Sequence, residues 1–145
     1  MAKVFTSSVI SAPVESVWRR IRDFNGLASW HPAVARSRIE DGLPSDRVGC
    51  VRNFELRDGG VIRETLLALD DIEHRCTYDI IESPMPLQNY VATLALLPVT
   101  NGDRTYAQWT ATFDCDPADR EDLVRSIGQD VFQAGFDALQ EELGR

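Results

Sequence analysis

Two charged residues fall among apolar residues in neighbouring predicted strands, where they could form a polar anchor for a ligand. Burying a pair of charges is costly unless the pair is well hydrogen-bonded, so a buried pair would indicate a role. The groups that such an anchor could bind are a carboxylate, a phenol or a carbonyl. The alternative is an ordinary surface ion pair, or two unrelated charges. The two residues are Arg52, which alternates with Cys50, Phe54 and Leu56, and Glu64, which alternates with Ile62 and Leu66.

The turn between these two strands decides whether Arg52 and Glu64 meet. If Asp58-Gly59-Gly60 forms a three-residue loop, Phe54 lies opposite Glu64, and Arg52 and Glu64 are diagonal neighbours on one face. If the turn has only two residues, the charges lie on opposite faces, because a shift of one residue inverts a strand. The sequence leaves both registers open.

A histidine provides the candidate acid or base at neutral pH. His31 lies in Trp30-His31-Pro32, the segment that leads from the first helical region into the strands. Imidazole changes charge near neutral pH and commonly transfers protons in enzymes. His31, Arg52 and Glu64 are therefore the candidate catalytic residues, and the sequence leaves open whether the chain is an enzyme. The alternative is a loop histidine that packs against Trp30 or Pro32.

No pattern of metal ligands or of cofactor-binding glycines is evident. His31 and His74 are far apart, and Cys50, Cys76 and Cys115 match none of the usual zinc spacings. The G-x-S-x-G motif, the P-loop and the dinucleotide fingerprint are also missing. We therefore expect no metal and no cofactor, and we expect His74 to be solvated in a hairpin turn.

The length and charge of the chain restrict its partners. Its 145 residues fit one domain, 1–145, which is large enough to bury a core without disulfides. A net charge of −8 argues against nucleic acid, and no apolar stretch approaches the roughly 20 residues that span a bilayer. Scattered cysteines and an N-terminus without a signal-peptide pattern predict a cytoplasmic protein. A homodimer is left open.

Hydrophobic periodicity predicts two helical regions around a run of strands. A strand at 3–11 is followed by a helix that begins near Pro13 and ends near Asn25-Gly26, and by one more turn at 27–30. Six strands then follow without an intervening helix, so they should pair antiparallel. Their predicted ranges are 34–40, 48–57, 61–69, 75–81, 87–99 and 103–113.

The C-terminal segment predicts one long helix from Asp116-Pro117 to about Leu143, with Asp116 as the N-cap. Gly128 and Gly135 fall on its apolar face, where each glycine costs about 1 kcal/mol relative to alanine. Two inward glycines indicate either a sheet that approaches closely or a cavity. The other residues of this face are Leu123, Val124, Ile127, Val131, Phe132, Ala134, Ala138, Leu139 and Leu143.

A hairpin signal aligns large aromatic side chains on one face of the sheet. A two-residue Asn101-Gly102 turn places Leu94 opposite Trp109 and Tyr90 opposite Phe113. These aromatic residues, together with Tyr78, should therefore face the long helix. They either fill the core or line a cavity, and both alternatives stay open here.

Several short segments match one known group of proteins when they are taken together. They are Ile10-Ser11-Ala12-Pro13-Val14-Glu15-Ser16-Val17-Trp18, Asp23-Phe24, Trp30-His31-Pro32, Gly49 with Arg52, Asp58-Gly59, Ile62 with Glu64, and Tyr78. With them the chain resembles the START-like superfamily (helix-grip, birch-pollen-allergen-like or SRPBCC proteins), and within it the bacterial polyketide cyclase/dehydrase family. The resemblance implies an α+β helix-grip fold. In that fold a curved seven-stranded antiparallel sheet surrounds a long C-terminal helix, with one or two short helices after the first strand.

The same resemblance implies an apolar cavity between the sheet and the C-terminal helix, with the loop around His31 near its mouth. A single START-like ligand-binding domain would then occupy the whole chain. The residues expected to contact a ligand are Trp30, His31, Arg52, Phe54, Glu64, Tyr78, Tyr90, Trp109, Gly128, Val131, Phe132 and Gly135.

Two functions are compatible with this expectation, because a fold alone does not establish a chemistry. The first is a protein that binds a small hydrophobic or aromatic molecule (lipid-, polyketide- or phenol-like) without catalysis. The alternative is a polyketide-type cyclase or dehydratase that uses acid and base residues in the same cavity. A protein-interaction module is a third class.

Overall fold

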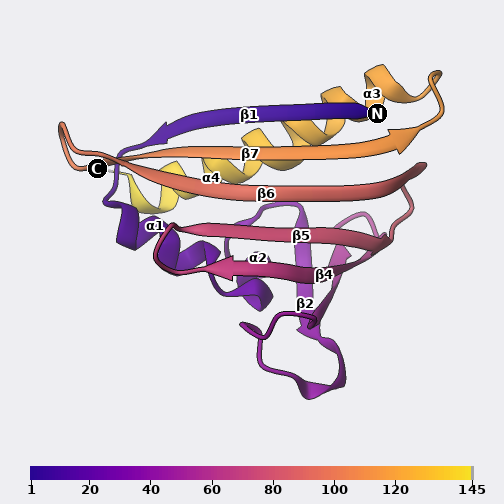
Figure 1. The fold of residues 1–145 in the computed structure, drawn as a ribbon, viewed down its shortest axis with the longest axis horizontal. Helices are drawn as coiled ribbons and strands as arrows, with labels where there is room; N and C mark the ends of the chain where they lie inside the picture. Colours follow the sequence, from indigo (N-terminus) through magenta and orange to yellow (C-terminus); the bar gives the residue numbers. More distant parts are fainter. Residues whose placement is uncertain (145) are drawn as a thin grey trace.

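Seven antiparallel strands form one curved sheet in the computed structural model, which describes residues 1–144 (Figure 1). The strand order is β1-β7-β6-β5-β4-β3-β2, so the first strand pairs with the last. This arrangement confirms the predicted α+β helix-grip fold. The strands are β1 (Ala2–Ile10), β2 (Val34–Ile39), β3 (Val51–Leu56), β4 (Val61–Asp70), β5 (Arg75–Glu82), β6 (Leu87–Val99) and β7 (Arg104–Cys115).

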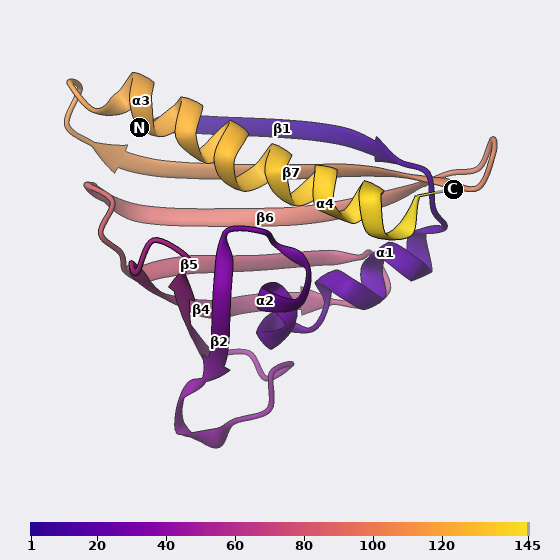
Figure 2. The ribbon, with the colours of Figure 1, turned by 180° about the vertical axis from the view of Figure 1, so that it is seen from behind.

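The C-terminal helix crosses one face of the sheet, and the short N-terminal helices lie near its C-terminal end (Figure 2). Its three segments, α3 (Arg120–Ser126), η3 (Ile127–Gln133) and α4 (Ala134–Leu143), continue directly into one another. Among the described residues, no helix is both long enough and apolar enough to cross a membrane. The shorter helices are α1 (Val14–Ile21), η1 (Phe24–Gly26), α2 (Leu27–Trp30) and η2 (Glu40–Gly42).

The C-terminal helix begins later than the sequence predicts. Asp116 does not cap it, because residues 117–119 form a separate turn before α3. In this turn the Asp119 N–H donates to the Asp116 carbonyl over 2.9 Å, and the Ala118 N–H donates to Asp116 Oδ1 over 3.3 Å. Aspartate side chains favour such local turns. The turn therefore delays the helix to Arg120.

A π-helical segment, η3, changes the phase of the C-terminal helix in its middle. Ile127 and Phe132 are both buried although they are five residues apart. In an α-helix that spacing turns a side chain by about 140°, whereas i to i+5 hydrogen bonding places the two on one face. Phe136 and Leu139 continue the buried face. A uniform α-helical period does not anticipate this change, and the face predicted from the sequence omits Phe136.

The hairpin between β6 and β7 has the predicted register. Leu94 pairs with Trp109, as the two-residue Asn101-Gly102 turn requires. A register shift lies near the far end of the hairpin, and there the rings of Tyr90 and Phe113 stack with centroids 6.1 Å apart. All four of the aromatic residues predicted to face the helix are buried in the core, namely Tyr78, Tyr90, Trp109 and Phe113.

The hairpin between β3 and β4 corrects the predicted position of the ion pair. Its three-residue loop is 57–59 rather than 58–60, because the Leu56 N–H donates to the Gly60 carbonyl over 2.7 Å. Gly59 takes the left-handed backbone conformation (φ 97°) that a glycine adopts without strain. The register moves by two residues, so Arg52 lies directly opposite Glu64 and not diagonal to it.

One glycine allows the helix to approach the aromatic core closely. A Cβ atom at Gly135 would lie 3.0 Å from the Trp109 ring, 3.1 Å from the His31 ring and 3.2 Å from the Trp30 ring. The corresponding atom at Gly128 would meet Val4 of β1 at 3.5 Å, which is an ordinary contact. Gly135 is therefore required by packing, whereas Gly128 is not.

This difference leads to a paired prediction for alanine substitutions. Gly135→Ala should lower the free energy of unfolding by about 1–3 kcal/mol, because three buried rings must move. Gly128→Ala should leave stability unchanged or raise it by up to about 1 kcal/mol, because alanine favours a helical backbone. Urea denaturation of both variants measures the effect. Equal destabilisation by the two substitutions would contradict this account of the helix packing.

Candidate functional site

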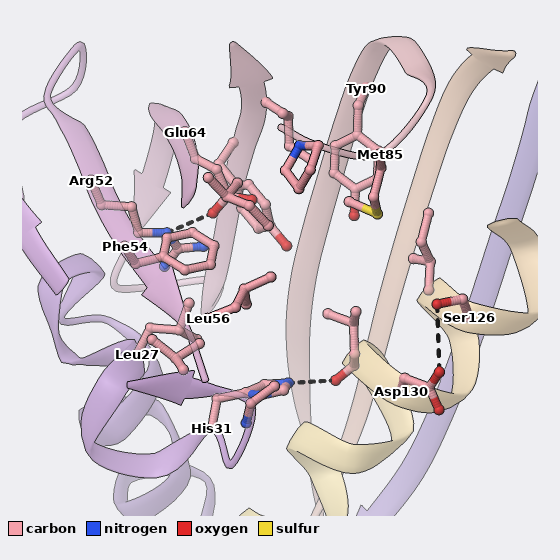
Figure 3. Close-up of a pocket in the computed structure, with 18 of the residues that line it drawn as sticks. Leu27, His31, Arg52, Phe54, Leu56, Glu64, Met85, Tyr90, Ser126 and Asp130 are labelled. Atoms are coloured by element: carbon pink, nitrogen blue, oxygen red, sulfur yellow. Dashed lines mark hydrogen bonds and ion pairs between the residues drawn. The ribbon is translucent and has the colours of Figure 1, made fainter. Parts of the chain in front are cut away.

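A cavity of about 480 Å³ lies between the sheet and the C-terminal helix (Figure 3). Small-molecule sites in proteins commonly measure about 300–1,000 Å³. Strands β3 to β7 contribute to its wall on one side, and α3 and η3 contribute on the other. Most lining side chains are apolar, and the polar ones are few. The wall of the cavity is therefore mainly apolar.

The cavity opens between two loops of the sheet and the helix. The β3–β4 loop contributes Asp58, the β5–β6 loop contributes Pro84 and Pro86, and the helix contributes Asp130. These four residues are exposed, whereas the polar and aromatic residues deeper in the cavity are buried. A molecule that enters from solvent therefore passes prolines and carboxylates before it reaches the inner wall.

A buried ion pair forms the inner polar wall. Arg52 Nε donates to Glu64 Oε1 over 2.7 Å, and the two residues are 6% and 5% exposed. Arg52 Nη1 also donates to the Phe24 carbonyl over 3.2 Å. Cross-strand pairing of β3 with β4 brings the two side chains together on the inner face of the sheet. Arg52 and Glu64 therefore form a buried ion pair and not an ordinary surface pair.

Aromatic rings cover the guanidinium group of Arg52. Its central carbon lies 4.0 Å from the centroid of the Phe24 ring and 4.8 Å from that of Tyr78. Burial acts to lower the pKa of Arg52, but Glu64, Tyr78 and Cys76 together outweigh it and raise that pKa. Burial also raises the pKa of the Glu64 carboxyl, and the adjacent guanidinium opposes the rise. Arginine remains protonated in proteins, so its positive charge favours the ionised form of Glu64 and the pair is ionic.

A second polar contact joins Trp109 to Tyr78. The indole Nε1–H of Trp109 donates to the Tyr78 hydroxyl oxygen over 3.0 Å, and both side chains line the cavity. Burial raises the pKa of Tyr78 and of Tyr90, so both hydroxyls stay protonated at neutral pH. Tyrosine hydroxyls in an apolar wall can orient a ligand by donating or accepting a hydrogen bond.

His31 is buried, and both of its ring nitrogens have partners. Nε2 lies 2.7 Å from the Val131 carbonyl, and Nδ1 accepts from the Ala33 N–H over 3.1 Å. These contacts require a proton on Nε2 and a free lone pair on Nδ1, which is the neutral imidazole. Burial lowers the pKa of His31, consistent with that form. The ring thus ties the loop after α2 to the π segment η3.

The structure brings most of the predicted ligand-contacting residues to one cavity. Those that line it are His31, Arg52, Phe54, Glu64, Tyr78, Tyr90, Trp109 and Val131, so all three candidate catalytic residues are among them.

The other four predicted residues lie elsewhere. Phe132 stacks on Trp109 with ring centroids 4.5 Å apart and an angle of 12°, and Trp30 packs 6.2 Å from the same ring. Gly135 lies against these rings, and Gly128 faces β1. These residues do not line the cavity, although three of them support its wall. The sequence placed Gly128, Phe132 and Gly135 on the same helix face as Val131, but of these four only Val131 lines the cavity.

Some residues that line the cavity were not predicted, and they come from loops and from the polar side of the C-terminal helix. Asp58 and Met85 come from hairpin loops, and Ser126 and Asp130 come from helix positions predicted to face solvent. The Ser83-Pro84-Met85-Pro86 segment was a signal in the sequence, because a methionine between prolines provides a rigid apolar loop. His74 lies in the predicted hairpin turn but is largely covered, since its Nε2 lies 3.0 Å from Glu15 Oε1 and its ring packs on Trp18.

The remaining reactive groups do not add a metal site or a nucleophile to the cavity. Residues 1–144 hold no group of three or more His, Cys, Asp or Glu side chains arranged to bind a metal ion. Cys50 and Cys76 are buried free thiols, and burial raises the pKa of Cys76 to about 11. A thiol in that state is a poor nucleophile.

The helix-grip fold and its cavity define a START-like protein, and comparison with known families agrees. The family described as polyketide cyclase/dehydrase and lipid transport matches residues 1–144. The chain therefore belongs to this family.

The chain is similar to plant receptors in sequence and to bacterial proteins of known structure. Abscisic acid receptor PYL7 of Arabidopsis thaliana is 33% identical over 92 residues, which cover 61% of this chain but only 42% of the receptor. The solved structure of XoxI from Bacillus cereus is 30% identical, with a TM-score of 0.87 over 99% of this chain and 96% of XoxI. The Zhui aromatase/cyclase from Streptomyces has a TM-score of 0.80 over 97% of this chain and 92% of its own. At 16% identity, the likeness to Zhui shows the fold alone.

The buried pair leads to a prediction for a double-mutant cycle. Glu64→Leu should lower the free energy of unfolding by about 3–5 kcal/mol, because it leaves the Arg52 charge buried without a partner. Adding Arg52→Met should restore part of that loss, since no buried charge remains. Chemical denaturation of the single and double variants measures the coupling. A double variant whose loss equals the sum of the two single losses would contradict a coupled pair.

His31 leads to a prediction for the pH dependence of stability. Its pKa is lowered in the folded state, so the unfolded chain takes up the proton first as the pH falls. The stability that neutral His31 contributes is present above about pH 6.5 and is lost below it, by at most about 1.4 kcal/mol per pH unit. His31→Gln keeps an amide that can donate to Val131, and its stability should fall less steeply between about pH 7 and 5. Parallel slopes for the two proteins would show that His31 is not responsible.

Proposed function

We propose that the chain binds a small hydrophobic or aromatic molecule in the cavity between the sheet and the C-terminal helix, without catalysis. The observation that carries the proposal is the cavity of about 480 Å³ with an apolar lining. A ligand that loses about 200 Å² of apolar surface there would gain about 5 kcal/mol from burial. The tyrosine hydroxyls and the Arg52–Glu64 pair would then determine its orientation.

The state of the polar groups favours binding over chemistry. Both ring nitrogens of His31 are engaged with the backbone, which leaves no free position for a general acid or base. Glu64 is held by Arg52 at 2.7 Å. The relatives named as abscisic acid receptors also support a binding role, because a receptor of this fold needs no turnover.

A polyketide-type cyclase or dehydratase is the second candidate, because one observation favours it. Glu64 and Tyr78 lie in the same cavity, and burial raises the pKa of each, as is common for groups that transfer protons. Incubating the protein with benzoylacetone in deuterated water tests for enolisation at the central carbon. Exchange that is faster than in buffer and is lost in Tyr78→Phe would favour the enzyme, and exchange at the buffer rate would favour binding alone.

A matched pair of substitutions on β5 tests the binding site. Ile80 lines the cavity, whereas its neighbour Ile81 is 47% exposed. The uncharged fluorescent probe N-phenylnaphthylamine should bind the wild type with increased emission. Ile80→Trp should weaken binding about tenfold or more by filling the cavity, and Ile81→Trp should not change it, because successive strand residues face opposite sides.

The measurement is a fluorescence titration with each protein at equal concentration. Failure of the wild type to bind the probe, or equal loss of binding in both variants, would contradict the proposed site.

A further inference from the structure

The cavity lining contains more carboxylates than cationic side chains. Arg52 is the one cationic side chain in the described lining, and Asp58, Glu64 and Asp130 are the carboxylates. His31 is neutral, as its two backbone contacts require. One guanidinium among three carboxylates gives the lining a net charge of −2.

The charge of the Arg52 guanidinium is already balanced by Glu64. Glu64 occupies Nε at 2.7 Å, and the Phe24 carbonyl occupies Nη1 at 3.2 Å. The rings of Phe24 and Tyr78 cover the group at 4.0 and 4.8 Å. An incoming carboxylate would either displace Glu64 and leave it buried without its partner, or add a second negative charge beside a single buried cation. Both outcomes are unfavourable.

The two remaining carboxylates lie at the opening, where a ligand first meets the protein. Asp58 holds the β3–β4 loop through Oδ1, which accepts from the Gly60 N–H over 2.9 Å. Figure 3 shows Asp130 on the helix, across the cavity from Arg52 and within reach of Ser126. No cationic side chain of the described lining lies beside them. These carboxylates repel an approaching anion, and the repulsion falls with added salt.

We infer that the cavity selects uncharged or amine-bearing aromatic molecules and rejects carboxylates. This inference rests on the proposed binding function and specifies its ligand class. It also removes a carboxylate from the groups that the buried arginine was expected to bind. An amine at the edge of the ligand would lie near Asp58 and Asp130, while a hydroxyl or carbonyl could pair with the tyrosines of the inner wall.

Three probes with one aromatic body and different charges test the inference. Naphthaleneacetic acid, naphthaleneacetamide and naphthylethylamine compete with N-phenylnaphthylamine at neutral pH and low salt. The amide and the amine should displace it at concentrations at least about tenfold lower than the acid. Added salt should reduce the advantage of the amine over the amide, because screening weakens only the charged probe.

Charge-neutral variants assign the effect to the opening. Asp58→Asn and Asp130→Asn keep the side-chain shape, and the double variant should reduce the amine-to-amide affinity ratio about threefold or more. Asp122→Asn is the matched control, because Asp122 is exposed on α3 and does not line the cavity. It removes the same charge and should leave the ratio unchanged.

The possible results separate this inference from the proposed function. If the acid displaces the probe as well as the amide does, the charge selection is overturned and the cavity stands as a binding site. If the double variant and Asp122→Asn lower the ratio equally, the net charge of the whole protein is responsible and the inference is also overturned. If N-phenylnaphthylamine does not bind at all, the proposed function itself fails.

Discussion

The close approach of the C-terminal helix to the aromatic side chains of the sheet is the constraint on which the rest of the structure depends. Gly135 lets the helix lie against Trp30, His31 and Trp109, and a Cβ atom there would lie only 3.0–3.2 Å from the three rings. Phe132 stacks on the ring of the same tryptophan. These contacts fix the helix at one end of the sheet, so the space beside η3 stays open as the cavity instead of closing by collapse.

The π segment and His31 are two consequences of this packing. Because η3 places Ile127 and Phe132 on one face, the helix buries a continuous row of side chains while Val131 and Asp130 still face the cavity. The Val131 carbonyl meets His31 Nε2 at 2.7 Å. The residue that looked most like a proton-transfer group in the sequence therefore joins two elements of the fold. π-Helical turns often occur near functional sites, and here the turn borders the cavity.

The buried ion pair has a different meaning in the structure from the one that its residue types suggest. A free arginine in an apolar cavity would attract anions. Here the charge of Arg52 is balanced by Glu64 and covered by aromatic rings, so it attracts an anion less. The cavity thus combines an apolar body with hydroxyl groups inside and carboxylates at its opening. Such a combination suits binding by shape and burial more than binding by charge.

Local signals determined much of what could be predicted from the sequence. The Asn101-Gly102 turn and strict alternation set the register of β6 with β7, because a two-residue turn permits one pairing. Alternation left open whether Arg52 and Glu64 share a face, because that depends on the β3–β4 turn. The turn is a three-residue loop that starts one residue earlier than expected, which moves the register by two residues and places the two charges directly opposite each other. The α-helical period identified the apolar face but not the π segment, since i to i+5 hydrogen bonds arise from tertiary packing rather than from local preference. Amino-acid types thus specified the sheet, its inward aromatic face and the helix that covers it. Only the tertiary structure decided that His31 is neutral and hydrogen-bonded through both ring nitrogens, that Glu64 balances the charge of Arg52, and that Asp58 and Asp130 line the cavity. Each of these features depends on contacts between residues far apart in the chain.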